Sequence, residues 1–225
     1  VNAVWGNAAS VLVGDFLISR ALQLMVALRH PRLLDIFSQS TNTISEGEVL
    51  QLINVRDPNT SEDNYMRVIH HKTAKMFESA AETGAVLAAD DNTDFTEAFA
   101  TYGRHLGIAF QLIDDVLDYQ GDASELGKNV GDDLAEGKPT LPLIRAMQCA
   151  SEADAEIIRQ AITNKDASHL SDILNIVSSC GALEYTRAAA ETASHKAVEA
   201  LNTLPDSPYR QTMQNLALEA LARRG

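Results

Sequence analysis

The chain has 225 residues, of which 45% are hydrophobic, and no shift in composition divides it. A chain of this length can bury a sizeable core, so we expect one domain over residues 1–225. Lys and Arg number 18 against 31 Asp and Glu, a formal net charge of -13. This charge argues against a protein that neutralises nucleic-acid phosphates with basic side chains alone. An acidic protein can still bind phosphate groups through a divalent cation.

The two cysteines, Cys149 and Cys180, lie far apart in the sequence and lack the spacing of metal ligands. They predict neither a disulfide framework nor a zinc site, which fits a reducing, cytoplasmic location. No stretch approaches the roughly 20 uninterrupted apolar residues that a membrane-spanning helix requires. The chain also does not open with a basic region followed by an apolar one. We therefore expect neither an export signal nor a membrane span.

Apolar residues recur at helical spacing through almost the whole chain, whereas alternation with a period of two is scarce. This pattern predicts an all-α protein. We expect the first helix to end before Pro31, because proline cannot continue a helix. The polar run 57–61 separates a second helix from a third, for which Thr60 or Ser61 provides the N-cap.

A further break at residues 89–93 precedes a long helix, expected from about Asp94 to about Tyr119. Residues 121–137 hold four glycines in a polar stretch and predict a long, mobile loop. Pro139 then suits the first turn of another helix, and Pro142 can still lie within that turn. Beyond this point we expect helices separated by short breaks near Lys165, near Gly181 and at residues 205–208.

The long helix carries the most informative residues. Asp114 and Asp118 are four apart and share one face of the helix, with Asp115 beside them. Their mutual repulsion among apolar neighbours is unfavourable without compensation. A divalent cation would compensate, and Mg²⁺ suits oxygen ligands with water and phosphate in the remaining positions. We predict that Asp114, Asp115 and Asp118 bind Mg²⁺.

The same helix face continues backward through Gln111, Gly107 and Gly103. One interpretation is that the glycines leave room for a ligand beside the acids, where Gln111 offers an amide. The other is that the glycines allow close helix packing and that the acids form a solvated face. The sequence leaves both open.

Two further segments offer positive charge to an anion. Lys72 and Thr73, in the middle of an amphipathic helix, present an ammonium group and a hydroxyl. Downstream of the acids, glycines in residues 127–140 permit closure, and Lys128 and Lys138 can approach a phosphate. Each segment also has a plain interpretation, because most lysines on helices and loops are solvated.

Residues 111–118 resemble the second aspartate-rich motif of trans-type polyprenyl diphosphate synthases, preceded by that family's Phe-Gln pair at Phe110 and Gln111. The resemblance spans essentially the whole chain and is closest to bacterial octaprenyl synthases that make quinone side-chain precursors. Other landmarks of the family occur in the same order, at residues 6–7, 11–15, 46–48, 51, 72–74, 127–128 and 137–138.

The resemblance implies an isoprenoid synthase-type helical bundle around a central cavity, and a Mg²⁺-dependent prenyltransferase that forms a homodimer. Such an enzyme condenses isopentenyl diphosphate with an allylic diphosphate, such as farnesyl diphosphate, into a longer all-trans polyprenyl diphosphate, here octaprenyl. The implied catalytic residues are Asp114, Asp115 and Lys72. The implied diphosphate contacts are Lys72, Thr73, Gln111, Lys128 and Lys138.

The sequence departs from the family in one respect. The family has two aspartate-rich motifs, and the first should precede the helix that begins near Gly6, where this sequence lacks it. Residues 90–94 are similar in sequence to an aspartate-rich motif. They lie, however, where one helix should end and another begin, and Asn92 and Thr93 are typical of helix caps. We interpret them as a connector and expect that the family's N-terminal helices are missing from this sequence.

Three alternatives remain. A class I terpene cyclase shares the helical scaffold, but its second metal motif usually has wider spacing than Asp114, Asp115 and Asp118. A non-catalytic subunit of a heteromeric synthase should have lost some of these aspartates or Lys72, which are all present. A purely structural helical protein would have no reason to collect these residues in the family's order.

Overall fold

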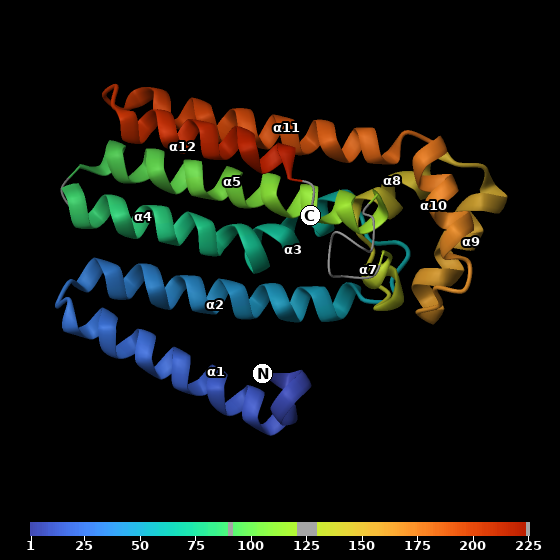
Figure 1. The fold of residues 1–225 in the computed structure, drawn as a ribbon, viewed down its shortest axis with the longest axis horizontal. Helices are drawn as coiled ribbons and strands as arrows, with labels where there is room; N and C mark the ends of the chain where they lie inside the picture. Colours follow the sequence, from blue (N-terminus) through green and yellow to red (C-terminus); the bar gives the residue numbers. More distant parts are fainter. Residues whose placement is uncertain (90–91, 121–129, 224–225) are drawn as a thin grey trace. The chain divides into compact units, whose positions relative to one another are not determined.

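The computed structural model describes residues 1–89, 92–120 and 130–223. Within these ranges it contains helices and no strand (Figure 1), which confirms the all-α prediction. The chain divides into two compact units, Val1–Gln39 and Ser40–Gly225, and the boundary falls inside helix α2 (Pro31–Asn54). The expectation of one domain over the whole chain therefore stays a prediction.

The first unit consists of α1 (Asn2–Ala27) and the start of α2. The backbone of α1 leaves helical geometry at Gly6, where φ is 77°, a left-handed conformation that glycine adopts without steric cost. No residue of α1 is buried. Among the described residues, α1 is the one helix long and apolar enough to cross a membrane by length and composition alone.

This finding is weak evidence for a membrane helix, because the core helix of a soluble protein passes the same test. The sequence expectation of no membrane span counted uninterrupted apolar residues, and Asp15 and Arg20 interrupt this helix. The mean hydropathy of α1 nevertheless stays high despite these two charged residues, so the helix is apolar enough on average to cross a membrane. The absence of a membrane span stays a prediction.

The second unit is built around α5 (Thr93–Gln120), which packs against α4 (Lys75–Ala89) on one side and α11 (Ala182–Ala200) on the other (Figure 1). Besides the rest of α2, the described residues of this unit also form α3 (Glu62–Ile69), the π-helix η1 (His70–Ala74), α7 (Asp132–Ala135), α8 (Leu141–Cys149), α9 (Glu152–Asn164), α10 (Leu170–Ser179), η2 (Leu201–Thr203), α12 (Pro208–Glu219) and η3 (Ala220–Ala222).

Capping residues explain where several of these helices begin. Ser61 caps α3 by accepting a hydrogen bond from the backbone N–H of Asn64, as predicted. Asn92 likewise accepts a hydrogen bond from the N–H of Phe95 at the start of α5. This cap agrees with the interpretation of residues 90–94 as a connector, although Asp90 and Asp91 lie outside the described residues.

Two local predictions need correction. The predicted loop over residues 121–137 contains a helical turn, α7, because Gly131 (φ 82°) starts it and Leu134 is fully buried. Residues 121–129, including Lys128, lie outside the described residues. The following helix starts at Leu141, so Pro139 lies before it, whereas Pro142 lies in its first turn as expected. The predicted breaks near Lys165 and Gly181 are confirmed as helix ends.

The apolar side chains of α5 fix how this helix is rotated. Leu112, Ile113 and Val116 are at most 1% exposed. Leu112 and Ile113 pack with Tyr65 and side chains of α8, while Val116 packs in a cluster formed with α8 to α11. Because these positions face the core, the polar residues between them are directed elsewhere, toward the cavity described next.

Candidate active site

A cavity of about 450 Å³ lies within the second unit. It brings together seven of the residues predicted from the sequence: Lys72, Thr73, Gln111, Asp114, Asp115, Asp118 and Lys138. The eighth, Lys128, lies outside the described residues. Other lining residues include Gln51, Tyr65, Asp132, Asp133, Glu136, Thr140 and Arg223.

Lys72 and Thr73 belong to the π-helix η1. Helices of this kind are rare and occur frequently at functional sites. Neighbouring helices approach η1 closely at two glycines. A Cβ added at Gly47 would lie 2.7 Å from the backbone nitrogen of Lys72, and one added at Gly107 would lie 2.6 Å from the Cα of Ala74.

The glycines of α5 therefore serve helix packing. A Cβ at Gly103 would likewise lie 2.4 Å from the carbonyl oxygen of Phe77 on α4. The interpretation that Gly103 and Gly107 leave room for a ligand is wrong, because backbone of η1 and α4 fills that space. Their effect on the site is indirect, through the close seating of η1 against α5.

Lys72 extends from η1 toward α2. Its Nζ donates a hydrogen bond to Oε1 of Gln51 and lies 3.3 Å from Oε2 of Glu48. Both partners belong to residues 46–51, a segment that resembles conserved positions of the family. The pair holds the ammonium group at the wall of the cavity, within reach of an anion inside it.

Asp115 is the most deeply buried acid of the cavity, at 2% exposure. Its Oδ2 accepts a hydrogen bond from Oη of Tyr65 at 2.6 Å, and its Oδ1 accepts one from Nε2 of Gln111 at 2.8 Å. Oε1 of Gln111 accepts a further bond from Oγ1 of Thr73 at 2.9 Å. These bonds join α3, η1 and α5 at the edge of the cavity.

Asp118 faces the turn that begins α7. Its Oδ2 accepts a hydrogen bond from the backbone N–H of Asp133 at 3.3 Å. Burial and the charge of Asp133 raise the pKa of Asp118 to about 7, and the same two causes raise the pKa of Asp115 to about 8. Burial and the charge of the neighbouring acid therefore disfavour the charged form of both carboxyls.

Lys138 adds a positive charge beside Asp133. Its Nζ donates to Oδ1 of Asp133 at 3.0 Å and lies 2.6 Å from Oε2 of Glu136. Burial lowers the pKa of Lys138, but the hydrogen bond to Glu136 and the charge of Asp133 outweigh burial and raise it. The ammonium group therefore stays charged next to the acids.

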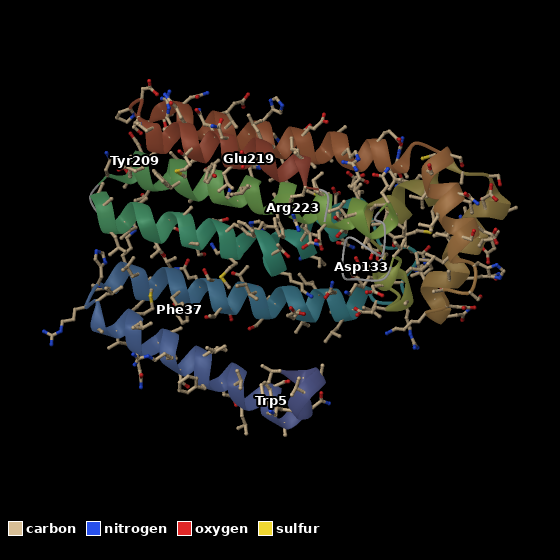
Figure 2. All side chains as sticks on the ribbon, in the orientation of Figure 1. Trp5, Phe37, Asp133, Tyr209, Glu219 and Arg223 are labelled. Carbon is tan, nitrogen blue, oxygen red and sulfur yellow. The ribbon has the colours of Figure 1, made fainter. Side chains whose placement is uncertain are left out.

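Asp114 lies near a second cation. Its Oδ1 is 3.8 Å from Nη2 of Arg223, whose guanidinium stacks 4.2 Å above the ring of Phe110. Asp133 and Arg223, both labelled in Figure 2, come from α7 and from the segment after η3.

Sequence reasoning missed Tyr65, Asp133 and Arg223 as cavity residues. Asp133 carried a usable signal, because it lies in the glycine-rich segment already assigned to the site. Tyr65 and Arg223 carried none, because each reaches the acids across a long stretch of sequence that spacing does not resolve.

The residues present fit a magnesium ion whose coordination is completed by water and by the phosphate groups of the substrate. In the described part of the chain, no three His, Cys, Asp or Glu residues converge as a closed metal site. Asp114, Asp118 and Asp133 nevertheless line the same cavity, and two carboxyls there have raised pKa values. Mg²⁺ is typically bound by one or two carboxylates with water and phosphate in the other positions. A bound cation would also favour the charged form of both carboxyls.

Comparisons with known proteins show to which family the chain belongs. The polyprenyl synthetase family matches residues 1–179. The octaprenyl diphosphate synthase of Escherichia coli (strain K12) is 51% identical over 223 residues, which cover 99% of this chain and 69% of that protein. The all-trans-nonaprenyl-diphosphate synthase (geranyl-diphosphate specific) of Rhodobacter capsulatus is 48% identical over 222 residues, with 99% and 68% covered.

Solved structures share the fold. The polyprenyl synthase of Caulobacter crescentus CB15, complexed with calcium and isoprenyl diphosphate, superposes with a TM-score of 0.94 at 40% identity and covers 100% of this chain and 69% of that chain. A decaprenyl diphosphate synthase from Rhodobacter capsulatus gives a TM-score of 0.91 at 41% identity, with the same coverage. The predicted isoprenoid synthase-type helical bundle is confirmed. The chain belongs to the polyprenyl synthetase family of trans-prenyltransferases.

Proposed function

We propose that this protein condenses isopentenyl diphosphate with an allylic diphosphate, such as farnesyl diphosphate, to make octaprenyl diphosphate for quinone side chains. The observation that carries the proposal is the single cavity in which Asp114 and Asp118 lie together with Lys72, Thr73 and Gln111. The product length is supported by the 51% identical relative, which is an octaprenyl diphosphate synthase.

We propose Mg²⁺ as the cofactor and Asp114, Asp115 and Asp118 as the residues around it. When bound, Mg²⁺ would supply positive charge that stabilises a departing diphosphate. The related Caulobacter structure, complexed with calcium and isoprenyl diphosphate, supports a divalent cation and a diphosphate in a cavity of this fold.

The side chains of this chain account for the rest of the mechanism. Lys72, Thr73 and Gln111 would bind and orient the allylic diphosphate, with Lys138 and Lys128 adding positive charge. Breaking the allylic C–O bond leaves a resonance-stabilised cation, which the isopentenyl double bond attacks. The departing diphosphate takes up the proton that is then lost. The contribution of the protein is electrostatic stabilisation of charge that develops as the bond breaks.

The direct test is to incubate the complete protein with isopentenyl diphosphate, farnesyl diphosphate and Mg²⁺ and to measure product length by mass spectrometry. We expect octaprenyl diphosphate as the main product, and no product when a chelator removes the cation. If no prenyl diphosphate longer than farnesyl diphosphate is formed, the proposed reaction is contradicted. A product of another length would contradict only the octaprenyl assignment.

We further propose that the protein works as a cytoplasmic homodimer. The family resemblance supports the dimer. The exposed apolar side chains of α1 form a surface that a second copy of the chain can bury in a dimer interface. Sedimentation equilibrium of the protein tests the dimer.

A further inference from the structure

Tyr65 contacts the proposed site although no motif pointed to it. It lies on α3 and is 5% exposed, and its ring packs with Ile69, Leu112 and Ile113. Its hydroxyl donates the 2.6 Å hydrogen bond to Oδ2 of Asp115. Burial, followed by the charge of Asp115, raises the pKa of Tyr65 well above its usual value, so the hydroxyl stays a donor.

Three hydrogen bonds link Tyr65 to Thr73 through Asp115 and Gln111. Asp115 accepts from Tyr65 on one oxygen and from Nε2 of Gln111 on the other, and Oε1 of Gln111 accepts from Oγ1 of Thr73. A glutamine amide has one accepting oxygen and an NH₂ with two donors. These partners therefore determine which way the amide of Gln111 faces, and one of its two N–H groups points to Asp115.

The same bonds restrict what Asp115 can do. Each of its two oxygens already accepts a short hydrogen bond from a side chain, and the residue is 2% exposed. Asp114 and Asp118 also line the cavity, and both are more exposed than Asp115. The geometry thus favours different roles for neighbouring acids, with Asp115 oriented toward protein partners.

We propose that Tyr65 is a positioning residue for prenyl transfer, holding Asp115 so that Asp115 and Thr73 together orient the amide of Gln111, whose second N–H is then directed to the diphosphate. This inference rests on the proposed function and deepens it. It assigns Asp115 an indirect role in place of the direct metal contact expected from its place in the motif. The four residues come from α3, η1 and α5, so the chain of bonds also fixes η1 relative to α5.

The first experiment is Tyr65→Phe in the complete enzyme, which removes the hydroxyl and keeps the buried ring. We expect kcat/KM for the allylic diphosphate to fall about 10- to 100-fold, the usual loss when a partner of a site residue is removed. We also expect the half-saturating concentration to rise more for the allylic diphosphate than for isopentenyl diphosphate, because Thr73 and Gln111 are assigned to the former.

Tyr102→Phe is the matched control. Tyr102 is also buried, at 3% exposure, and its hydroxyl donates to the backbone carbonyl oxygen of Met213 at 2.9 Å, away from the cavity lining. Each variant loses one buried hydrogen bond, so similar decreases in Tm are expected. Only Tyr65→Phe should lower kcat/KM.

A double-mutant cycle separates positioning from general support of the core. Thr73→Val removes the hydroxyl at the far end of the chain of bonds, and Tyr65 and Thr73 share no direct hydrogen bond. If the bonds act as one unit, Tyr65→Phe should lower kcat/KM much less in the Thr73→Val enzyme than in the wild type. Should Tyr65→Phe fail to fold, Asp115→Asn replaces it in the same cycle.

The proposal is overturned if Tyr65→Phe keeps wild-type kcat/KM, or if the two losses simply multiply. If the wild-type enzyme forms no prenyl diphosphate longer than its allylic substrate, the proposed function is overturned instead. An active wild type beside an equally active Tyr65→Phe enzyme removes only the role of Tyr65.

Discussion

Asp118 is held in a position that disfavours its charge. Burial and the nearby charge of Asp133 raise its pKa to about 7, against an ordinary value of 3.8. The backbone N–H of Asp133 opposes this shift without cancelling it. A site that retains such a carboxyl is arranged for a positive partner, which is why we connect Asp118 with cation binding.

We predict that Asp118→Asn stabilises the cation-free protein at pH 8 and that the gain shrinks as the pH is lowered toward 4. The folded state holds the Asp118 proton more tightly than the unfolded chain does, so the free energy of unfolding falls as pH rises through this range. The amide removes that loss, by on the order of 1 kcal/mol once screening by water is included. Thermal unfolding at both pH values measures it.

Glu97→Gln is the control for this prediction, because Glu97 is an exposed acid on the same helix. It should raise Tm at pH 8 by less than Asp118→Asn does. A pH-independent effect of Asp118→Asn would contradict the assigned cause. Added Mg²⁺ should stabilise the wild type more than the Asp118→Asn variant, since the amide is a weaker ligand.

Asp114 is the acid whose removal should affect turnover most directly. It lines the cavity one helical turn from Asp118 and lies 3.8 Å from Arg223. We predict that Asp114→Ala in the complete protein abolishes product formation and leaves helix content by circular dichroism unchanged. Glu97→Ala should keep normal turnover. Near-normal product formation by Asp114→Ala would remove this residue from the proposed metal site.

Spacing along α5 was sufficient to predict which acids share the site, but not how each is used. Asp114, Asp115 and Asp118 do line one cavity with Lys72 and Thr73. The bond from Tyr65 to Asp115 joins residues 50 apart in sequence. Periodicity describes one helix at a time, so it cannot reveal which side chain of another helix reaches a given carboxylate.

At the scale of elements, η1 is the feature that the sequence did not reveal. Residues 70–74 contain no proline, glycine or other turn signal, so an uninterrupted α-helix was the natural expectation. The π-helix occurs where Gly47 and Gly107 let α2 and α5 approach its backbone closely. Such a contact is tertiary. The N-cap at Ser61 and the breaks at Lys165 and Gly181 were predictable because each depends on local chemistry.

We predict that Gly107→Ala lowers both stability and activity. The new Cβ would lie 2.6 Å from the Ala74 Cα, so α5 and η1 must separate, and Thr73 and Lys72 would move with η1. We expect a loss of about 1–3 kcal/mol in the free energy of unfolding, as for other overpacked sites. Urea denaturation and kcat/KM for the allylic diphosphate measure the two effects.

Gly84→Ala is the matched control on α4, because a Cβ there meets nothing within 4 Å. It should be neutral or stabilise the helix by about 0.5–1 kcal/mol, since alanine restricts the unfolded chain. If Gly107→Ala behaves like Gly84→Ala, close contact between α5 and η1 does not position the site.

At the scale of the whole molecule, the fold class was predictable and the division of the chain was not. Helical periodicity extends through both units, so nothing in the composition marks the boundary inside α2. The second unit contains the whole cavity lining. In the first unit, α1 buries none of its residues.

The apolar surface of α1 leads to the last prediction, that the complete protein is a homodimer in buffer without detergent. Phe16, Leu17 and Ile18 are 66%, 60% and 58% exposed in the single chain, and soluble monomers rarely leave large contiguous apolar patches uncovered. Sedimentation equilibrium should give twice the chain mass. Leu17→Glu should shift the equilibrium toward monomer, whereas Tyr209→Glu, at an exposed position of α12, should not. A monomer at every concentration would contradict the dimer, and a requirement for detergent would instead favour a membrane role for α1.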